Sequence, residues 1–471
     1  MLDHIFRRYD IRGQMDSELF LEEIPRFGRA FAAYIHEKKP HAQKILVGRD
    51  GRVHSPLIQD LLLSALQESG FDIELAGICP TPVMYFGMHQ GCADAGIMIT
   101  ASHNGPSYNG FKLCLGKEIV WGDEIQKIHA LYKSYARVDA FQAGNIQQSL
   151  VKDAYVDWLV EHFAHLHNME TSALLDCGNG VAGTVLIPLA KELNWRNVHF
   201  LYEQVDGTYP HHEADPSVFE NMHDLSQMVQ ARGYDLGIGF DGDADRMIPL
   251  STSGELIAGD LVLVLLSQPV LIKNPGARIL FDMKCSHVVR DFIEQQGGNA
   301  IMVPTGHAII KYELHKQHAL LAGELSGHFY FNDRYFGYDD GIYAALRLFE
   351  LLLISGIPLH ELRNKLPRTF ITPEMRIACE EKDKTFIMDR AHLYFSTVPD
   401  VSIRLVEGLH ITLPEGSAII RPSHTQAVIC VRCESLSAAG LEKVKTQVYN
   451  ALDGYFDARL YTHLYKTPNI G

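Results

Sequence analysis

Short apolar runs with the length of buried strands alternate along this chain with stretches of helical spacing, and this alternation strongly limits the possible folds. A helical stretch near residues 56–69, for example, lies between two such runs. The runs are KILVG (44–48), FDIELAG (71–77), ALLDCG (173–178), DLGIGF (235–240) and ARILFDM (277–283). Strand–helix alternation is typical of α/β layers with largely parallel sheets. The sequence therefore predicts an α/β protein.

Changes in texture divide the 471 residues into four units, as expected for a chain of this length. A polar helical segment, 122–135, closes the first unit. From Thr369 the pattern changes to paired strand-like runs and a final helical stretch, which indicates a smaller α+β domain. We expect domains at 1–147, 148–252, 253–367 and 368–471.

The formal net charge is -15, from 42 Lys and Arg against 57 Asp and Glu. A general attraction to nucleic acid or to an anionic membrane surface is therefore not expected. An anionic substrate would need a site built locally from a few basic side chains. The apolar run 261–266 is far shorter than the ~20 residues that span a bilayer, and the first residues lack the apolar core of a signal peptide. These features predict a soluble cytoplasmic protein.

The cysteines are scattered, mostly in apolar surroundings, which favours buried thiols in a reducing compartment over a disulfide framework. Cys430 and Cys433 have CxxC spacing but lie in a strand-like run. Residues three apart on a strand face opposite sides, so we assign this pair no redox or metal role.

The strongest single motif is DGDADR, 241–246, directly after a strand-like run. Three alternating carboxylates repel one another unless a cation lies between them, and oxygen ligands suit Mg²⁺ or Ca²⁺. An EF-hand is rejected because its sixth and twelfth loop positions are here Arg246 and Thr252. A solvated acidic turn is the weaker alternative, since ligands bind at strand ends in α/β folds. Mg²⁺ that holds a phosphate is the better interpretation.

The stretch ITASHNGPSYNGFK, 99–112, follows another apolar run and is rich in turn-forming residues. It is a poor packing element but can present one hydroxyl, Ser102, among polar neighbours. A lone Ser–His pair in such a loop is more often a surface turn. No GxSxG surrounds Ser102 or Ser326, so a hydrolase with a nucleophile elbow is not supported.

In DCGNGVAG, residues Gly178, Gly180 and Gly183 form GxGxxG after a strand, and Glu203 follows about twenty residues later. The motif leaves an NAD-dependent oxidoreductase as a rival hypothesis. Glycines at a tight strand-to-helix turn also serve packing alone, which is the interpretation we favour.

Two further segments carry polar side chains suited to a sugar phosphate. In GELSGHFYF, an extended conformation would place Glu324, Ser326 and His328 on one face, where the first two could bind sugar hydroxyls and His328 could transfer a proton. In RPSHTQ, Arg421, Ser423 and Thr425 could clasp a phosphate. Alone, the Glu324 segment is equally compatible with a loop that has no role, and a segment like RPSHTQ is more often just a polar turn.

Taken together and in order, these segments resemble the α-D-phosphohexomutase family, in particular its bacterial phosphomannomutase/phosphoglucomutase branch. The resemblance runs nearly from end to end. The segments that carry it are YDIRG (9–13), VGRDGR (47–52), TASHN and YNGFK (100–112), DCGNG (176–180), DGTYPHHEADP (206–216), DGDADR (241–246), MKCS (283–286), TGHAIIK (305–311), GELSGH (323–328), FGYDDG (336–341) and RPSHT (421–425).

The resemblance implies three related α/β domains with mixed sheets and a smaller C-terminal α+β domain around a central cleft. It makes Ser102 a phosphoserine, and it implies that Mg²⁺ is bound by Asp241, Asp243 and Asp245 with one ligand from the Ser102 phosphate. A hexose 1- or 6-phosphate, of mannose or glucose, would be converted through a 1,6-bisphosphate that turns around in the cleft. Glucose or mannose 1,6-bisphosphate would serve as activator. A monomer or weak homodimer is expected.

Several further side chains gain roles from the same resemblance. Arg12, Lys112, Arg246 and Lys284 add positive charge around the transferring group, and Lys112, His103 and His328 are open alternatives for proton transfer. The expected substrate contacts are Arg246, Lys284, His307, Glu324, Ser326, Arg421, Ser423 and Thr425.

The chain departs from the family pattern at a few positions. Leu325 stands where phosphoglucosamine mutases usually have Gln, which argues against an amino-sugar substrate. Gly105 replaces a Pro that often follows SHN, and His424 and Gln426-Ala427 change the presumed phosphate loop. A Ser-dependent phosphatase or phosphotransferase and a non-catalytic sugar-phosphate binder remain as alternatives.

Overall fold

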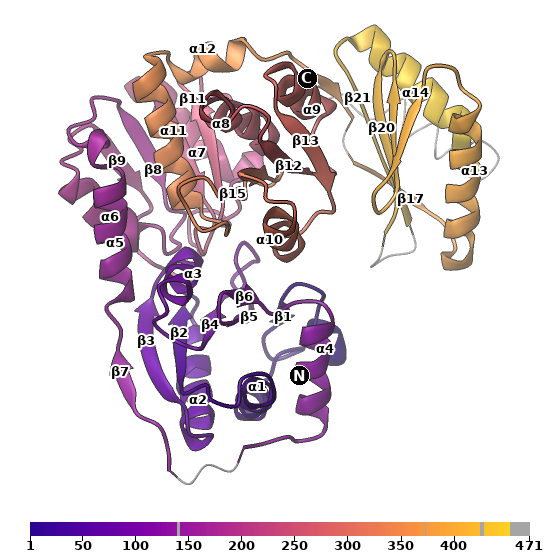
Figure 1. Ribbon diagram of the computed structural model, residues 1–471. Helices are drawn as coiled ribbons and strands as arrows, with labels where there is room; N and C mark the ends of the chain where they lie inside the picture. The colour runs from indigo at the N-terminus through magenta and orange to yellow at the C-terminus, as the bar shows by residue number, and fades with distance from the viewer. Residues whose placement is uncertain (139–141, 373, 424–427, 453–471) are drawn as a thin grey trace.

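The computed structural model describes residues 1–138, 142–372, 374–423 and 428–452. Four β-sheets, each with its own helices, follow one another along this part of the chain (Figure 1). The expected fold class is therefore confirmed, with three mixed α/β sheets and a further C-terminal unit. No helix within these residues combines the length and apolar character needed to cross a bilayer.

The first sheet is mixed, with parallel central strands and antiparallel pairing at one side. Its order is β1 (Ile11–Gln14), β5 (Tyr108–Leu115), β4 (Ala95–Ile99), β2 (Lys44–Arg49), β3 (Asp72–Ile78) and β7 (Ile146–Gln148), and β6 (Glu118–Ile119) pairs with β5. Its helices are α1 (Ile24–Lys38), α2 (Ser55–Glu68), α3 (Thr81–His89) and α4 (Asp123–Lys133).

The second and third sheets each combine parallel strands with one antiparallel edge strand. The second has the order β11 (Met247–Ser251), β10 (Leu236–Phe240), β8 (Ala173–Asp176), β9 (Val198–Leu201), with α5 (Val151–His162), α6 (Gly183–Glu192) and α7 (His223–Arg232). The third has the order β13 (Asn299–Val303), β12 (Arg278–Asp282), β14 (Leu321–Gly323), β15 (Phe329–Phe331), with α8 (Gly259–Lys273), α9 (His287–Gln295), α10 (His307–Lys316), α11 (Gly341–Ser355) and α12 (Leu359–Asn364).

The fourth sheet is antiparallel throughout and carries the last two described helices. Its order is β16 (Phe370–Ile371), β21 (Val428–Ser435), β20 (Gly416–Pro422), β19 (Leu409–Leu413), β18 (Ser402–Leu405), and β17 (Met375–Ala378) also pairs with β21. The helices are α13 (Lys384–Ser396) and α14 (Ala438–Leu452).

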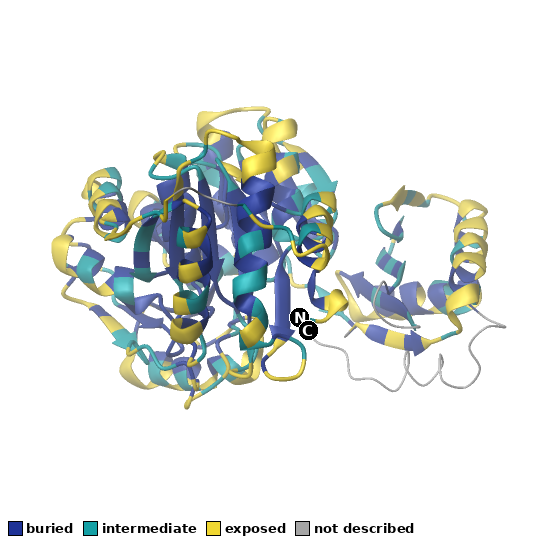
Figure 2. Cartoon of the chain, turned by 90° about the horizontal axis from the view of Figure 1, so that it is seen from below, coloured by how far each residue is buried: buried dark blue, intermediate teal, exposed yellow. Residues whose placement is uncertain are grey.

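One hydrophobic core runs through the first three sheets. It includes Leu46 on β2, Leu175 on β8, Leu265 on α8 and Phe349 on α11, all completely or almost completely buried. We call the described residues from 1 to 364, up to the end of α12, the N-terminal block. Residues 370–452, from β16 to α14, form the C-terminal unit, whose core is separate (Figure 2). Burial of apolar surface therefore joins three sheets into one body and leaves the fourth outside it.

Candidate active site

Ser102 lies in the loop after β4, in a backbone conformation that few non-glycine residues adopt. Its φ is 52°, in the left-handed region. The Ser102 N–H donates to Thr100 Oγ1 at 2.8 Å, and Ser102 Oγ donates to Asp241 Oδ2 at 2.8 Å. The loop thus directs one buried hydroxyl at a carboxylate from another sheet.

Asp241, Asp243 and Asp245 lie in the loop after β10 and are completely buried. Their ligand atoms lie within 4.8 Å of one another, and Asp243 Oδ1 has no hydrogen-bond partner in the described part of the chain. Burial, together with the charges of Asp245 and Asp243, raises the pKa of Asp241 well above its usual range. Crowded buried carboxylates with an unsatisfied oxygen suit a hard divalent cation. The residues therefore fit the expected Mg²⁺.

Glycines let the loops of the first two sheets come close. A Cβ on Gly242 would lie 2.6 Å from the Ser102 carbonyl oxygen, and one on Gly180 would lie 2.8 Å from the Gly242 carbonyl oxygen. A Cβ on Gly183 would similarly lie 2.7 Å from the Glu203 carbonyl oxygen. Gly180 and Gly183 therefore have a packing reason to be glycine, which supports the structural interpretation of the GxGxxG motif over NAD binding.

Lys112 extends from β5 into the carboxylate cluster. Its Nζ donates to Asp243 Oδ2 at 2.6 Å and also bonds Asp245 Oδ2. Thr81 Oγ1 at the start of α3 donates to the same Asp243 oxygen at 2.6 Å. Burial disfavours the ammonium form, but Asp243 and Asp245 outweigh burial and raise the pKa of Lys112. Lys112 is therefore a cation here.

His328 is also cationic at neutral pH. Its Nε2 lies 3.2 Å from Asp245 Oδ1 and its Nδ1 lies 3.3 Å from Glu324 Oε1. Burial and Arg246 disfavour the charged imidazole, but the two carboxylates prevail and raise the pKa of His328 to about 9. Both Lys112 and His328 thus supply positive charge to the cluster.

His103, next to Ser102, is neutral by contrast. Its Nδ1 lies 2.8 Å from Asp215 Oδ2, and Asp215 lies 4.0 Å from Arg246. The charge of Arg246 and burial outweigh Asp215 and lower the pKa of His103 to about 4. Since an ionised carboxylate only accepts, Nδ1 carries the proton and Nε2 keeps its lone pair.

Arg12 on β1 reaches the other side of the Ser102 loop. Its guanidinium donates to Asp10 Oδ2 at 2.5 Å and to Asn104 Oδ1 at 2.6 Å. The side chain is almost completely buried, with 9% of the residue exposed. Arg246 lies at the end of the loop that carries Asp241, with its Nε 3.8 Å from Asp241 Oδ2. Two guanidinium groups therefore flank the Ser102–Asp241 contact.

The segment with Glu324, Ser326 and His328 is a tight turn between β14 and β15, so the expected extended conformation is wrong. The Glu324 N–H donates to the His328 carbonyl, and Gly327 has a φ of 92°. The turn still gathers the three side chains, because Ser326 Oγ lies 3.3 Å from His328 Nδ1. Glu324 accepts from Tyr330 Oη at 2.5 Å, which fixes its carboxylate.

His307 begins α10 near the same cluster. Its two ring nitrogens are buried and have no hydrogen-bond partner among the residues that the structure describes. Burial and the charge of Lys311 lower the pKa of His307 well below its usual range. The ring lies 6.2 Å from that of Tyr9. A neutral imidazole with unused nitrogens is compatible with the expected substrate contact.

A cavity of about 430 Å³ lies between the N-terminal block and the C-terminal unit. Lys284, Arg421 and Arg432 line it, and the Arg421 guanidinium donates to Glu374 Oε2 at 2.8 Å. Ser423 directly follows β20, and its N–H donates to the Val428 carbonyl. Thr425, His424 and Gln426-Ala427 lie outside the described residues. Three basic side chains thus gather where a distal phosphate is expected.

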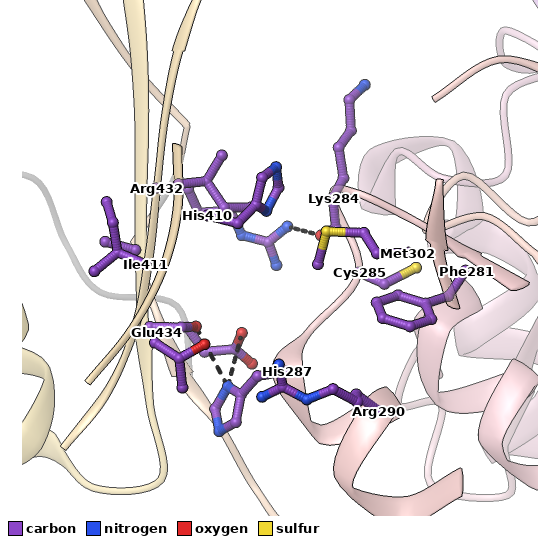
Figure 3. Close-up of a pocket in the computed structure, with 14 residues that line it drawn as sticks. Phe281, Lys284, Cys285, His287, Arg290, Met302, His410, Ile411, Arg432 and Glu434 are labelled. Atoms are coloured by element: carbon purple, nitrogen blue, oxygen red, sulfur yellow. Dashed lines mark hydrogen bonds and ion pairs between the residues drawn. The ribbon is translucent and has the colours of Figure 1, made fainter. Parts of the chain in front are cut away.

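Polar contacts beside this cavity join the C-terminal unit to α9 and the residues before it (Figure 3). Glu434 accepts from Ser286 Oγ and lies 3.4 Å from His287 Nδ1. The Arg432 guanidinium donates to the Lys284 carbonyl at 2.7 Å. The position of Arg421 relative to the N-terminal block therefore depends on a few polar groups.

Sequence reasoning missed Thr81, Asp215 and Arg432. Their partners are Asp243, His103 and the Lys284 carbonyl, which lie 162, 112 and 148 residues away in the chain. Asp215 belongs to the HHEADP segment, but nothing local indicates its partner. Only the fold brings these pairs together.

Family models for phosphoglucomutase/phosphomannomutase match three successive parts of the chain. They are alpha/beta/alpha domain I at residues 3–139, domain II at 153–254 and domain III at 258–370. Their order agrees with the three α/β sheets and with the placement of Ser102, the Asp cluster and the Glu324 turn on successive sheets. The fold and the site together define an α/β phosphohexomutase architecture.

Curated relatives and a solved structure agree with these matches. The phosphoglucomutase of Neisseria meningitidis is 36% identical over 94% of this chain and 95% of its own. The phosphomannomutase/phosphoglucomutase of Pseudomonas aeruginosa is 36% identical over 95% of each chain. A phosphoglucomutase/phosphomannomutase family structure from Burkholderia thailandensis superposes with a TM-score of 0.86 at 32% identity, over 96% of this chain and 98% of that one. The chain therefore belongs to the phosphoglucomutase/phosphomannomutase branch of the α-D-phosphohexomutase family.

Proposed function

We propose that the chain interconverts hexose 1-phosphates and hexose 6-phosphates, of glucose, mannose or both, through a phosphoryl group carried on Ser102. The observation that carries this proposal is the 2.8 Å contact between Ser102 Oγ and Asp241 in a buried cluster of acidic and basic groups. A hydroxyl in such a cluster suits phosphoryl transfer, which depends on positioning and charge neutralisation. Family membership gives the reaction class.

Asp241, Asp243 and Asp245 would hold Mg²⁺, with Ser102 or its phosphate as a further ligand. Bound there, Mg²⁺ supplies positive charge to the phosphoryl group and polarises its phosphorus. The chain adds fixed cations of its own. Arg12, Arg246, Lys112 and His328 surround the same point, so charge that develops on phosphoryl oxygens meets a preorganised environment.

The hydrogen-bond geometry favours His103 as the group that accepts the proton of the attacking sugar hydroxyl. Lys112 and His328 are held by the carboxylates of the proposed metal site, whereas His103 has an open Nε2. Asp215 holds its Nδ1 at 2.8 Å and so orients the ring. Ser102 would regain a proton from the same imidazole when phosphate leaves it.

The sugar and the distal phosphate have their own groups. Glu324 and Ser326 would bind two hydroxyls of the hexose, with His307 beside them, and Lys284, Arg421 and Arg432 would bind the phosphate that does not react. Ser423 and Thr425 would complete that phosphate site. Glucose and mannose differ at C2 only, so a site that binds other hydroxyls accepts both. The bisphosphate must turn around between the two half-reactions, which the cavity beside the C-terminal unit would allow.

A coupled assay tests the proposal. The protein is incubated with Mg²⁺, a trace of glucose 1,6-bisphosphate, and either glucose 1-phosphate or mannose 1-phosphate. Formation of the 6-phosphate is expected, and Ser102→Ala should lower kcat by about 10³-fold or more because it removes the nucleophile. Ser107→Ala, at an exposed serine in the same segment, is the matched control.

Other products would contradict the proposal. Inorganic phosphate as the main product would indicate a phosphatase, and unchanged sugar phosphate with unchanged binding in Ser102→Ala would indicate a binding protein. A change in NADH fluorescence on mixing would revive the oxidoreductase.

A further inference from the structure

Arg52, in the VGRDGR segment after β2, is completely buried beneath the Ser102 loop. Its guanidinium donates to four carbonyl oxygens, three in that loop and one at the start of β5. They belong to Ser102 (2.8 Å), Asn104 (2.5 Å), Gly105 (2.7 Å) and Tyr108 (3.0 Å). Arg52 Nε donates to Asp50 Oδ2 at 3.0 Å, which fixes the side chain from below. Arg52 therefore sets the direction of three peptide groups in the loop and of one at the start of β5.

The direction of a carbonyl fixes the direction of the next N–H. In a trans peptide these two groups point opposite ways, and the described chain has no cis peptide bonds. Because the carbonyls of Ser102 and Asn104 point at Arg52, the N–H groups of His103 and Gly105 point away from it. Within the described residues, neither N–H donates to a protein acceptor.

Side chains of the same loop contact the groups proposed to bind phosphate. Ser102 Oγ bonds Asp241, and Asn104 Oδ1 accepts from Arg12 at 2.6 Å. N–H groups with open donors on one side of a loop form a concavity that binds anions. Hydrogen bonds from such donors to phosphate oxygens are charge-assisted and strong.

We propose that the N–H groups of His103 and Gly105 bind oxygens of the phosphoryl group on Ser102, and that Arg52 is the positioning residue that aims them. The inference rests on the proposed function and assigns it donors beyond the side chains named above. The Gly105 donor sets this chain apart, because the Pro that often stands there in the family has no N–H.

Gly105 can be replaced without an evident clash. Its φ is not in the left-handed region, and a Cβ would meet only Glu213 Oε1, at an ordinary 3.5 Å. Gly105→Pro removes the donor, whereas Gly105→Ala keeps it and adds a side chain. The two variants therefore differ in the N–H and in the proline ring, which also fixes φ at residue 105 and restricts Asn104.

The full chain and the two variants are titrated with glucose 1,6-bisphosphate, and the phosphorylated fraction of Ser102 is followed by intact mass. Relative to Gly105→Ala, Gly105→Pro should need about tenfold more bisphosphate for half phosphorylation and lose about tenfold in kcat, with KM within twofold. Equal values in an otherwise active enzyme would overturn this inference alone. An unmodified chain that never becomes phosphorylated would overturn the proposed function as well.

Arg52→Lys tests the positioning role. A compact ammonium keeps the charge but cannot reach four carbonyls, so kcat and the phosphorylated fraction should fall by about 10²-fold. Arg347→Lys, on α11, is the matched control. Arg347 is also buried, with 2% of the residue exposed, and its guanidinium donates to Asp333 at 2.9 Å. Both variants should lose thermal stability, but only Arg52→Lys should lose phosphorylation. Wild-type phosphorylation of Ser102 in folded Arg52→Lys would contradict the positioning role of Arg52. If Arg52→Lys does not fold, the comparison of Gly105→Pro with Gly105→Ala tests the inference.

Discussion

The N-terminal block and the C-terminal unit are held together by contacts of a different kind from those inside the block. Within the block, apolar side chains from three sheets form one continuous core. Between the block and the C-terminal unit, the contacts that approach the cavity are polar, such as Glu434 with Ser286 and His287, and the Arg432 guanidinium with the Lys284 carbonyl. A further ion pair, Arg8 with Glu407, is exposed.

This difference separates two requirements of the proposed reaction. Phosphoryl transfer needs groups held to a fraction of an ångström, and Ser102, Lys112 and the Asp cluster all belong to the block with the shared core. Binding, turning and releasing a bisphosphate needs a part that can move. Arg421 lies on the unit attached by polar contacts, which weaken in water more readily than a packed core.

Asp241→Asn should have the largest effect, because it changes the proposed metal site within the N-terminal block. Loss of one metal-binding carboxylate should lower kcat by about 10³-fold. In EDTA the variant should melt at or above the wild-type temperature, because burial and its carboxylate neighbours already raise the pKa of Asp241. Mg²⁺ should raise the melting temperature of the wild type only. A Mg²⁺ shift that survives in the variant would contradict the metal site.

Arg421→Ala tests the C-terminal unit. Loss of a guanidinium at the distal phosphate should lower kcat/KM by about 10²-fold, mostly through KM, with the Mg²⁺-induced rise in melting temperature retained. Arg404→Ala, at an exposed position on β18, should behave as wild type. A fall in kcat without a change in KM would show that Arg421 does not bind the substrate.

Glu434→Gln weakens the polar contacts between the N-terminal block and the C-terminal unit. The amide removes the charge that faces His287, so the C-terminal unit should close less favourably and kcat/KM should fall about fivefold. Small-angle scattering in the presence of substrate should then show a less compact chain than the wild type. Glu415→Gln, on the exposed pair with Lys443, is the control. No change in either measurement would indicate that the contact of Glu434 with His287 does not affect how the C-terminal unit closes.

Asp340→Asn has the smallest expected effect and probes the shared core. Asp340 accepts from Tyr155 Oη at 2.6 Å and from the Tyr343 N–H at 2.8 Å, and burial raises its pKa from 3.8 to about 7. Between these values the folded state holds a proton that the unfolded state releases. The free energy of unfolding therefore falls as pH rises from about 4 to 7, and the cost persists above pH 7.

The Asn variant cannot ionise and keeps an acceptor for the Tyr343 N–H. The difference in melting temperature, variant minus wild type, should therefore increase by several degrees from pH 5 to pH 8. Melting temperatures measured across this range check the expectation. Parallel pH profiles for the two proteins would show that Asp340 is already ionised in the folded state.

The sequence predicted the α/β units because buried strands and amphipathic helices have local signatures, as in KILVG and the helix that follows it. It also predicted that Ser102 and the DGDADR residues belong to one site, through the order of motifs. The turn at Glu324–His328 was missed, since alternation alone does not distinguish a strand from a turn that Gly327 permits.

Roles that depend on distant partners could not be predicted. His103, His328 and Lys112 were equal candidates for proton transfer in the sequence. Their difference arises from Arg246 and Asp215 beside His103, and from Asp245 beside the other two. Arg52 could not be assigned a role from the sequence, because its four acceptors lie about fifty residues further along.

Transfer of a labelled phosphate shows whether Ser102 carries the phosphoryl group. The protein is loaded with glucose 1,6-bisphosphate labelled in its phosphates, freed of excess sugar, digested and mapped. One label per chain is expected on Ser102. It should leave when unlabelled glucose 1-phosphate is added and reappear in the bisphosphate. Label on another residue, or undiminished turnover in Ser102→Ala, would contradict this role of Ser102.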